Sequence, residues 1–192
     1  MPKISTHSVL HVDDDPAIRS LLSRQLENAG IEARQAEDGI DGLVKLRDKL
    51  PNVIISDLLM PRMSGIEFIS VVRRRFPSIS VIAFSGSIPG EFPAEAKPDA
   101  WFEKGPLQFH ALLQSVHDLA RKTPDRPYLP QVISIPVRTR PNGAGYFVLT
   151  CTDCLRVFQV ASTPKNTTVK RTAVCDHCEA RVPYLIESSE PA

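Results

Sequence analysis

The sequence has no long hydrophobic run, and this absence bears on where the protein can act. Nowhere in its 192 residues do about 18 apolar residues follow one another, which is the length that a membrane-spanning helix needs. The first ten residues also lack the apolar core of a secretory signal peptide. We therefore expect a cytoplasmic protein that makes no contact with membranes.

Net charge is also small, since 23 Lys and Arg stand against 22 Asp and Glu. So small a charge gives no chain-wide attraction to nucleic acid or to an acidic membrane surface. The balance is uneven along the chain, because residues 1–121 carry a net charge of −2 and residues 122–192 one of +3. The sequence therefore divides into two electrostatically different parts.

Cysteine is absent from the first 150 residues, and all four cysteines lie in the second part. They form two C-x2-C pairs with twenty residues between them, Cys151 with Cys154 and Cys175 with Cys178. In a reducing compartment such pairs are more often metal ligands than disulfides. The spacing predicts a structural zinc site closed by four thiolates. His177, inside the second pair, is expected to be solvated.

Apolar runs of strand length alternate with amphipathic stretches of helix length through the first part. Such alternation is typical of a parallel sheet with crossover helices. The first helix is the best marked, because Asp15 can cap it, Pro16 suits its first turn and Gly30 can end it. Further helices are predicted at 38–50, 65–76 and 106–121. Strands are predicted at 8–12, 31–36, 52–56, 79–84 and 100–102.

Proline marks two irregular stretches. Residues 86–98 hold three prolines and two glycines, so any helix there is expected to be short or absent. Residues 122–130 are again rich in proline and predict a stiff linker. Beyond it, residues 131–189 consist of short runs rich in Val, Ile, Tyr and Phe, separated by turns. This pattern, with the cysteine spacing, looks like a small β-rich zinc ribbon.

Polar side chains follow four of the predicted strands at their carboxyl ends. In chain order they are Asp13, Asp14, Asp57, Ser85 and Lys104. In an open parallel sheet these ends meet at one crevice, where ligands bind. Clustered carboxylates suit Mg²⁺ and phosphate chemistry, with Asp57 as the attacking group and Ser85 and Lys104 on the phosphoryl oxygens. Each residue alone is more simply a cap, a turn former or a solvated side chain.

Four segments carry a resemblance to a known family. VLHVDDDPAIRSLL, IISDLLMPRMSG, VIAFSG and WFEK, in this order, resemble the receiver domain of two-component response regulators over about residues 5–121. The resemblance implies a flavodoxin-like, doubly wound α/β fold with a five-stranded parallel sheet. It also implies a phosphoacceptor signalling protein rather than an enzyme. Its partners would be a sensor histidine kinase or phosphotransfer protein, and an output partner protein.

The resemblance also implies a role for each matching residue. It makes Asp57 the phosphoacceptor, and it assigns Mg²⁺ to Asp13, Asp14, Asp57 and the backbone carbonyl of Leu59. It assigns phosphoryl contact and switching to Ser85, Trp101 and Lys104. Two features depart from the family pattern: Gly105 separates Lys104 from the usual proline, and the proline-rich residues 86–98 fall where the family has its fourth helix.

The second part gives only weak support for nucleic-acid binding. Zn²⁺ with four thiolates would add −2 to its charge and leave about +1, which is little for phosphate-driven affinity. Contact with a protein is therefore at least as well supported. In the first part, the basic run Arg73, Arg74 and Arg75 is interpreted as a solvated helix end rather than a nucleic-acid patch.

Two alternative functions remain open. A phosphatase of the haloacid-dehalogenase type would also use an Asp after the first strand, but four residues after Asp13 it needs Thr or Val, and Ala17 stands there. It also needs an acidic pair beyond the lysine, where only Glu103 and Asp118 lie near. The other alternative is a receiver-like scaffold that no longer takes phosphate and whose tail docks a partner.

Overall fold

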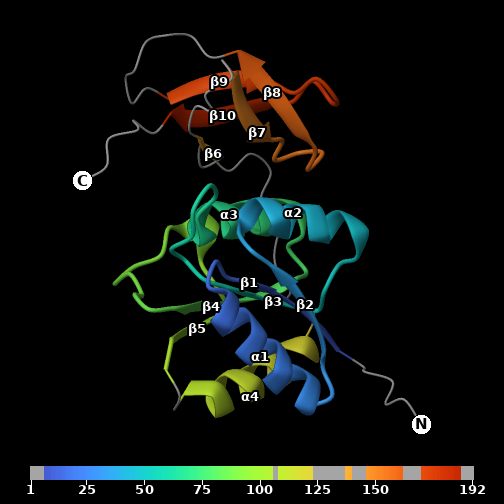
Figure 1. Ribbon diagram of the computed structural model, residues 1–192, viewed down its shortest axis with the longest axis vertical. Helices are drawn as coiled ribbons and strands as arrows, with labels where there is room; N and C mark the ends of the chain where they lie inside the picture. The colour runs from blue at the N-terminus through green and yellow to red at the C-terminus, as the bar shows by residue number, and fades with distance from the viewer. Residues whose placement is uncertain (1–6, 106–107, 123–136, 140–145, 162–169, 187–192) are drawn as a thin grey trace. The chain divides into compact units, whose positions relative to one another are not determined.

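The computed structural model describes residues 7–105, 108–122, 137–139, 146–161 and 170–186. The chain separates into two compact units, Met1–Pro130 and Gln131–Ala192, and Figure 1 shows the helices and strands of each. Among the described residues, no helix combines the length and apolar character required to cross a membrane.

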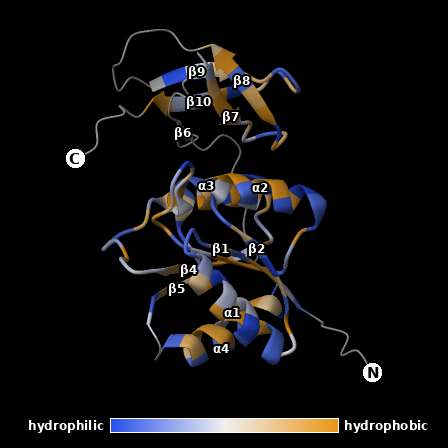
Figure 2. Cartoon of the chain, viewed as in Figure 1, coloured by the Kyte–Doolittle hydropathy of each residue, from blue (hydrophilic) through white to orange (hydrophobic). Residues whose placement is uncertain are grey.

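Five parallel strands form the sheet of the first unit, in the order β2-β1-β3-β4-β5. They are β1 (Ser8–Val12), β2 (Glu32–Ala36), β3 (Val53–Ser56), β4 (Ser80–Ser85) and β5 (Ala100–Glu103). Every residue of the three central strands is buried, because both faces are covered, and Figure 2 shows their hydrophobic character. The reversal of strand order between β1 and β3 is that of a flavodoxin-like fold. The predicted fold of this part is confirmed.

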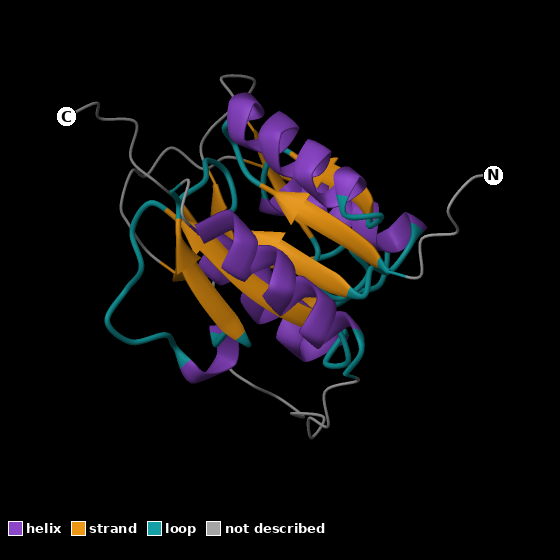
Figure 3. Cartoon of the chain, turned by 90° about the horizontal axis from the view of Figure 1, so that it is seen from below, coloured by secondary structure: helices purple, strands orange, loops and turns teal. Residues whose placement is uncertain are grey.

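Helices cover both faces of this sheet, as Figure 3 shows. α1 (Pro16–Asn28) and α4 (Phe109–Ala120) lie on one face, and α2 (Gly39–Asp48) and α3 (Gly65–Arg75) lie on the other. Each helix begins or ends within a few residues of its predicted bounds. The predicted first two residues of α4, 106 and 107, lie outside the described residues.

The ends of the helices follow from local capping. Asp15 accepts hydrogen bonds from the backbone of Ala17 at 2.8 Å and Ile18 at 3.4 Å, which satisfies amides that the first turn leaves unpaired. Gly30, just beyond α1, has a φ of 76°, a left-handed conformation that glycine adopts without a steric penalty. α3 begins with a capping box between Ser64 and Glu67.

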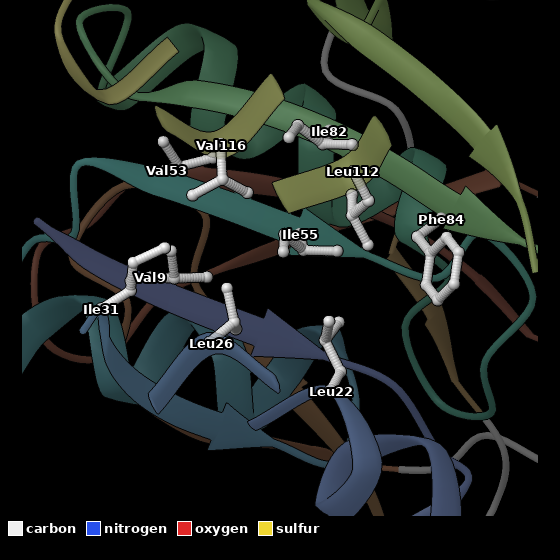
Figure 4. Packing of buried hydrophobic residues seen from close by; sticks show 10 residues of the cluster. All are labelled: Val9, Leu22, Leu26, Ile31, Val53, Ile55, Ile82, Phe84, Leu112 and Val116. Atoms are coloured by element: carbon white, nitrogen blue, oxygen red, sulfur yellow. The ribbon is translucent and has the colours of Figure 1, made fainter. Parts of the chain in front are cut away.

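The apolar core between α1, α4 and the sheet is continuous, and Figure 4 shows its side chains packed across the layers. Burying each such aliphatic side chain stabilises the fold by about 1.5–3 kcal/mol relative to leaving it exposed. The members of this core are Val9, Leu22, Leu26, Ile31, Val53, Ile55, Ile82, Phe84, Leu112 and Val116. The core thus fixes where the ends of β1, β3 and β4 lie.

Residues 86–98 hold only one short helical turn, η1 (Ala94–Ala96), as the prolines predict. The chain after it is fixed by Arg73 of α3, whose guanidinium donates to the Lys97 carbonyl at 2.8 Å and to the Asp99 carboxylate at 3.0 Å. The interpretation of the basic run as solvated was therefore wrong for Arg73, which is buried. It lies one helical turn after the buried Ile69 and on the same face.

The second unit contains two small sheets. β6 (Val137–Thr139) pairs in parallel with β10 (Arg181–Ile186), which pairs antiparallel with β9 (Lys170–Val174). β7 (Tyr146–Thr150) and β8 (Val157–Ala161) form an antiparallel pair. Their buried apolar residues are Phe147, Leu149, Phe158, Ala173, Val182, Tyr184 and Ile186. The predicted β-rich character is present among the described residues. Residues 123–130 of the expected linker and residues 131–136, at the start of the expected ribbon, lie outside the described residues.

Gly65 is expected to tolerate no side chain, because a Cβ there would lie 1.9 Å from the carbonyl oxygen of Asp57. Replacing it with alanine must displace backbone, and we expect the Gly65→Ala variant to lose about 1–3 kcal/mol of unfolding free energy. Urea denaturation of the first unit measures this loss. A Cβ added at Gly86 would have no atom within 4 Å. Gly86→Ala is therefore the matched control and should change the unfolding free energy by less than about 0.5 kcal/mol. Equal costs for the two variants would contradict the close approach.

Candidate functional site

The carboxyl ends of four neighbouring strands bring the predicted polar residues of the first unit together. Asp13 directly follows β1, Asp57 follows β3, and Lys104 follows β5, while Ser85 is the last residue of β4. β1, β3, β4 and β5 are adjacent in this order and parallel, so their ends meet at one edge of the sheet. This is also the edge where ligands bind in sheets of this topology.

The Asp57 carboxylate lies at the centre of the cluster and is held by donors on both oxygens. Its Oδ1 accepts hydrogen bonds from the amides of Leu58 at 2.6 Å and Leu59 at 3.2 Å. The Ser85 hydroxyl donates to the same oxygen at 2.5 Å. Its Oδ2 faces the Lys104 ammonium at 2.5 Å. The carboxylate is therefore fixed in orientation, with one oxygen saturated by donors and the other next to a cation.

Three carboxylates converge in this cluster. One oxygen from each of Asp13, Asp14 and Asp57 lies within 4.8 Å of the others. Asp13 and Asp57 are buried, whereas Asp14 is exposed, so the group is open to solvent on one side. Oxygen donors with room for water suit Mg²⁺, which keeps several waters when it binds proteins. These residues fit a magnesium site.

Lys104 offsets part of this negative charge, because its Nζ also lies 2.8 Å from Asp13 Oδ2. Burial lowers the pKa of Lys104, but the hydrogen bonds with Asp13 and Asp57 outweigh burial and raise its pKa above the usual range. Burial raises the pKa of Asp13, but the nearby His11 ring and the Lys104 ammonium outweigh burial and lower the pKa. The lysine and Asp13 therefore stay charged at neutral pH.

Asp13 is supported by two further side chains, which the sequence analysis did not single out. His11 is fully buried on β1, with Nε2 3.6 Å from Asp13 Oδ2. Arg19 of α1 donates to the Asp13 backbone carbonyl at 2.6 Å. The spacing of two residues between His11 and Asp13 was an available signal, because alternate residues of a strand point to one face. Nothing comparable in the sequence pointed to Arg19.

The other two residues of the predicted site lie beside the cluster. Leu59 follows Asp57 by two residues, and its side chain is 66% exposed. Trp101 lies on β5 with 52% of its surface exposed, and its ring packs against Phe92 with 5.9 Å between centroids. Trp101 is therefore a surface aromatic that contacts the irregular stretch between β4 and β5.

The four cysteine sulfurs of the second unit lie within 4.8 Å of one another. Cys151 Sγ is 3.5 Å from Cys178 Sγ, and Cys154 Sγ is 3.7 Å from Cys175 Sγ. Tetrahedral zinc with Zn–S bonds of about 2.3 Å requires sulfurs about 3.8 Å apart. The arrangement therefore has the size of a four-thiolate zinc site.

Both cysteine pairs lie in turns with the same backbone pattern. In the first turn the Leu155 amide donates to the Cys151 carbonyl, and in the second the Glu179 amide donates to the Cys175 carbonyl, each at 2.9 Å. Both donors have left-handed φ, 59° and 61°. Backbone amides also point at the first sulfur of each pair, at 3.3 Å from Asp153 and 3.4 Å from His177. These two turns present the sulfurs to a common point.

The sulfurs differ in how readily they lose a proton. Burial raises the pKa of Cys151 to about 12, and burial also raises the pKa of Cys154. Burial would raise the pKa of Cys175 as well, but the backbone amides of His177 and Cys178 outweigh it and lower the pKa. The His177 side chain is exposed, and its Nε2 lies 3.2 Å from the Val157 carbonyl oxygen.

The fold and the acidic cluster define a class of protein, the receiver domains that take up phosphoryl groups in signalling. Residues 9–97 match the response regulator receiver domain family. The chain belongs to this family, since it is also 31% identical to the chemotaxis protein CheY4 of Vibrio cholerae and covers 98% of that chain. This assignment decides against the haloacid-dehalogenase interpretation.

Curated relatives are similar to the first unit. The DNA-binding transcriptional regulator NtrC of Escherichia coli is 33% identical over 98 residues, which are 51% of this chain and 21% of NtrC. The nitrogen assimilation regulatory protein NtrX of Azorhizobium caulinodans is 34% identical over 82 residues, which are 42% of this chain and 18% of NtrX. The chain therefore spans about a fifth of the length of these relatives.

Solved structures show the same receiver fold. CheY4 of Vibrio cholerae superimposes with a TM-score of 0.54 over 59% of this chain. The response regulator TrrA of Thermotoga maritima, in complex with Mg²⁺ and BeF, has a TM-score of 0.56 at 28% identity, covering 59% of this chain and 99% of TrrA. TrrA has also been solved in complex with the histidine kinase ThkA.

Glu179 is a site where glycine should stabilise the second unit. Its φ of 61° is unfavourable for a residue with a Cβ, and its side chain is exposed. We expect Glu179→Gly to raise the unfolding free energy of the second unit by about 0.5–1 kcal/mol, measured by denaturant unfolding with zinc present. Glu179→Ala removes the same charge but keeps the strain, so it should show no such gain. A gain of equal size in both variants would mean that the charge, not the backbone, is responsible.

Proposed function

We propose that this response regulator accepts a phosphoryl group on Asp57. The observation that carries the proposal is the cluster around this carboxylate, in which Ser85 and Lys104 contact its oxygens and the acidic pair lies within ligand distance. A carboxylate in this setting can act as a nucleophile toward phosphorus. Beyond accepting the phosphoryl group, we propose at most slow self-dephosphorylation, so the protein would be a signalling protein rather than an enzyme.

The two oxygens of Asp57 have different parts in the proposed reaction. Oδ1 accepts three hydrogen bonds, which leaves Oδ2 as the attacking atom. A bond forms between Oδ2 and phosphorus, while the bond from phosphorus to the donor breaks and its electron pair leaves with the donor. The ammonium of Lys104 can move from the carboxylate to the new phosphoryl oxygens and offset their charge.

The acidic pair prepares the site for an incoming phosphate. Mg²⁺, when held by Asp13, Asp14, Asp57 and the backbone carbonyl of Leu59, supplies positive charge that offsets the repulsion between carboxylates and phosphate. Asp13 is fixed by the amide of Asp15, which donates to its Oδ1 at 3.0 Å. Asp14 is the exposed member, so we propose that it admits the metal from solvent.

Conformational output is proposed to start at Ser85. Its hydroxyl must release Asp57 Oδ1 to reach a phosphoryl oxygen, and the chain that follows it is the irregular stretch 86–98. Phe92 in this stretch packs on Trp101, so a shift after Ser85 reaches an exposed aromatic pair. We propose Trp101 as the switching residue on this basis.

The second unit is proposed to be a structural zinc ribbon. The bounds follow the sequence prediction, with a receiver at 5–121, a linker at 122–130 and the ribbon at 131–189. Zinc would join the turn between β7 and β8 to the turn between β9 and β10, which come from different sheets. Four thiolates fill a tetrahedral zinc site and leave no open position for catalysis. We therefore propose that the second unit holds a binding surface for an output partner, and we favour a protein over nucleic acid as that partner.

The proposed donor is a sensor histidine kinase or a phosphotransfer protein. The similarity to TrrA, which binds the histidine kinase ThkA, supports this choice. A receiver-like scaffold without phosphate uptake is the competing function, and it predicts no covalent change at Asp57.

Asp57 should gain one phosphoryl group when the purified protein is incubated with Mg²⁺ and acetyl phosphate. The product is an acyl phosphate, which resists acid and is cleaved by base, and intact-mass spectrometry detects it. Asp57→Asn should gain none, and Asp14→Ala should need more Mg²⁺ for the same rate. A wild-type mass that never shifts with any phosphodonor would favour the scaffold function.

Zinc affinity of the second unit should fall as the pH falls. Burial keeps the Cys151 thiol protonated at neutral pH, so zinc must displace its proton. For each proton displaced, the apparent zinc affinity falls about tenfold when the pH falls by one unit. Competition with a chromophoric chelator between about pH 6 and pH 8 measures this slope. Cys175→Ser should bind zinc more weakly at every pH. A native mass spectrum without zinc would contradict the ribbon assignment.

A further inference from the structure

Arg62 lies in the loop that joins β3 to α3 and follows Asp57. Its φ is 63°, a left-handed conformation that is unfavourable for a residue with a Cβ. Such a conformation persists where the surrounding contacts impose it, and it is found most often near functional sites.

The guanidinium of Arg62 reaches two acidic residues that directly precede α2. Its Nη2 lies 2.5 Å from Glu37 Oε1, and its Nε contacts Asp38 Oδ2. The Arg62 side chain is 51% exposed, whereas the Asp38 side chain is fully buried. A surface cation thus reaches a carboxylate that solvent does not.

The positive charge of Arg62 stabilises the buried carboxylate of Asp38. Its Oδ1 caps α2 by accepting a hydrogen bond from the Asp41 amide at 2.9 Å, and its Oδ2 is buried. Burial raises the pKa of Asp38, and the charge of Arg62 acts in the opposite direction. A buried carboxylate that loses the cation paired with it is strongly destabilised. The pairing therefore ties the β3–α3 loop to the start of α2.

The same loop is held at two other points. The Gly65 amide donates to the Leu58 carbonyl at 3.0 Å, and the Gly39 amide donates to the Met63 carbonyl at 3.3 Å. Between these contacts the chain passes through Leu59. Of residues 59–63, Arg62 has the charged side chain, and it forms the ion pairs that join this loop to the start of α2.

We propose that Arg62 is a positioning residue for Mg²⁺ binding at the phosphorylation site. By pairing with Glu37 and Asp38, it holds the loop that carries Leu59, whose amide donates to Asp57 Oδ1 at 3.2 Å. This inference rests on the proposed function, in which the Leu59 carbonyl is a metal ligand. Arg62 itself touches neither the metal nor the phosphoryl group, so its effect is on metal affinity.

The test is a double-mutant cycle on the full chain, with Mg²⁺ affinity measured by calorimetry. Arg62→Ala should raise the Kd for Mg²⁺ about tenfold, as expected for a residue that orients a metal ligand. Asp38→Asn retains a capping side chain but loses the charge, and should raise the Kd similarly. The double variant should be no worse than either single one, because both changes break the same pair.

Phosphorylation by acetyl phosphate at increasing Mg²⁺ gives the second readout. Arg62→Ala should need more Mg²⁺ for half-maximal rate and reach nearly the wild-type rate at saturation, whereas a merely structural defect lowers the rate at every Mg²⁺ concentration. Arg62→Lys should recover part of the affinity. Lys45→Ala is the matched control, because Lys45 pairs with the partly buried Asp41 on α2 at 3.9 Å. This variant should bind Mg²⁺ as the wild type does.

Three outcomes overturn the inference. They are an unchanged Kd in Arg62→Ala, additive effects in the double variant, and normal Mg²⁺ affinity in Arg62→Gly, which removes the guanidinium and relieves the strained φ together. Failure of the proposed function looks different, because the wild type then binds Mg²⁺ but gains no phosphoryl group. The calorimetric affinities still decide the role of Arg62 in that case.

Discussion

The charges at the carboxyl edge of the sheet can stay together only because Lys104 lies among them. Asp13 and Asp57 are both buried and both face its ammonium, whose positive charge offsets the repulsion between the two carboxylates. The strand order produces this arrangement, since β1, β3, β4 and β5 end side by side. The same backbone that buries the apolar core therefore also sets the electrostatics of the site.

The sequence predicted most of the first unit because its signals were local and agreed with one another. The apolar runs of β1, β3 and β4 and the cap at Asp15 marked elements near where they were found. The ends of those strands also predicted which polar residues would meet. Arg73 was misinterpreted because its burial depends on Asp99 and Lys97, which are distant in the sequence. The contacts of Arg62 with Glu37 and Asp38 were missed for the same reason.

The second unit was predicted from a different kind of signal. Its cysteine spacing indicated a metal site without any knowledge of the strands, because two residues between ligands fit one tight turn. The left-handed residues Leu155 and Glu179 were not foreseen, since glycine is the usual marker of that conformation. The two units were therefore predicted from different features, apolar patterning in one and cysteine spacing in the other.

The half-exposed ring of Trp101 has a practical consequence for anyone who studies this protein in solution. The chain contains one tryptophan, and it lies on β5, at the border between the sheet and the stretch that follows Ser85. Indole emission excited at long wavelength therefore originates in the first unit alone, and the second unit contributes nothing to it. The protein carries a built-in optical probe that separates the behaviour of its two halves without any label.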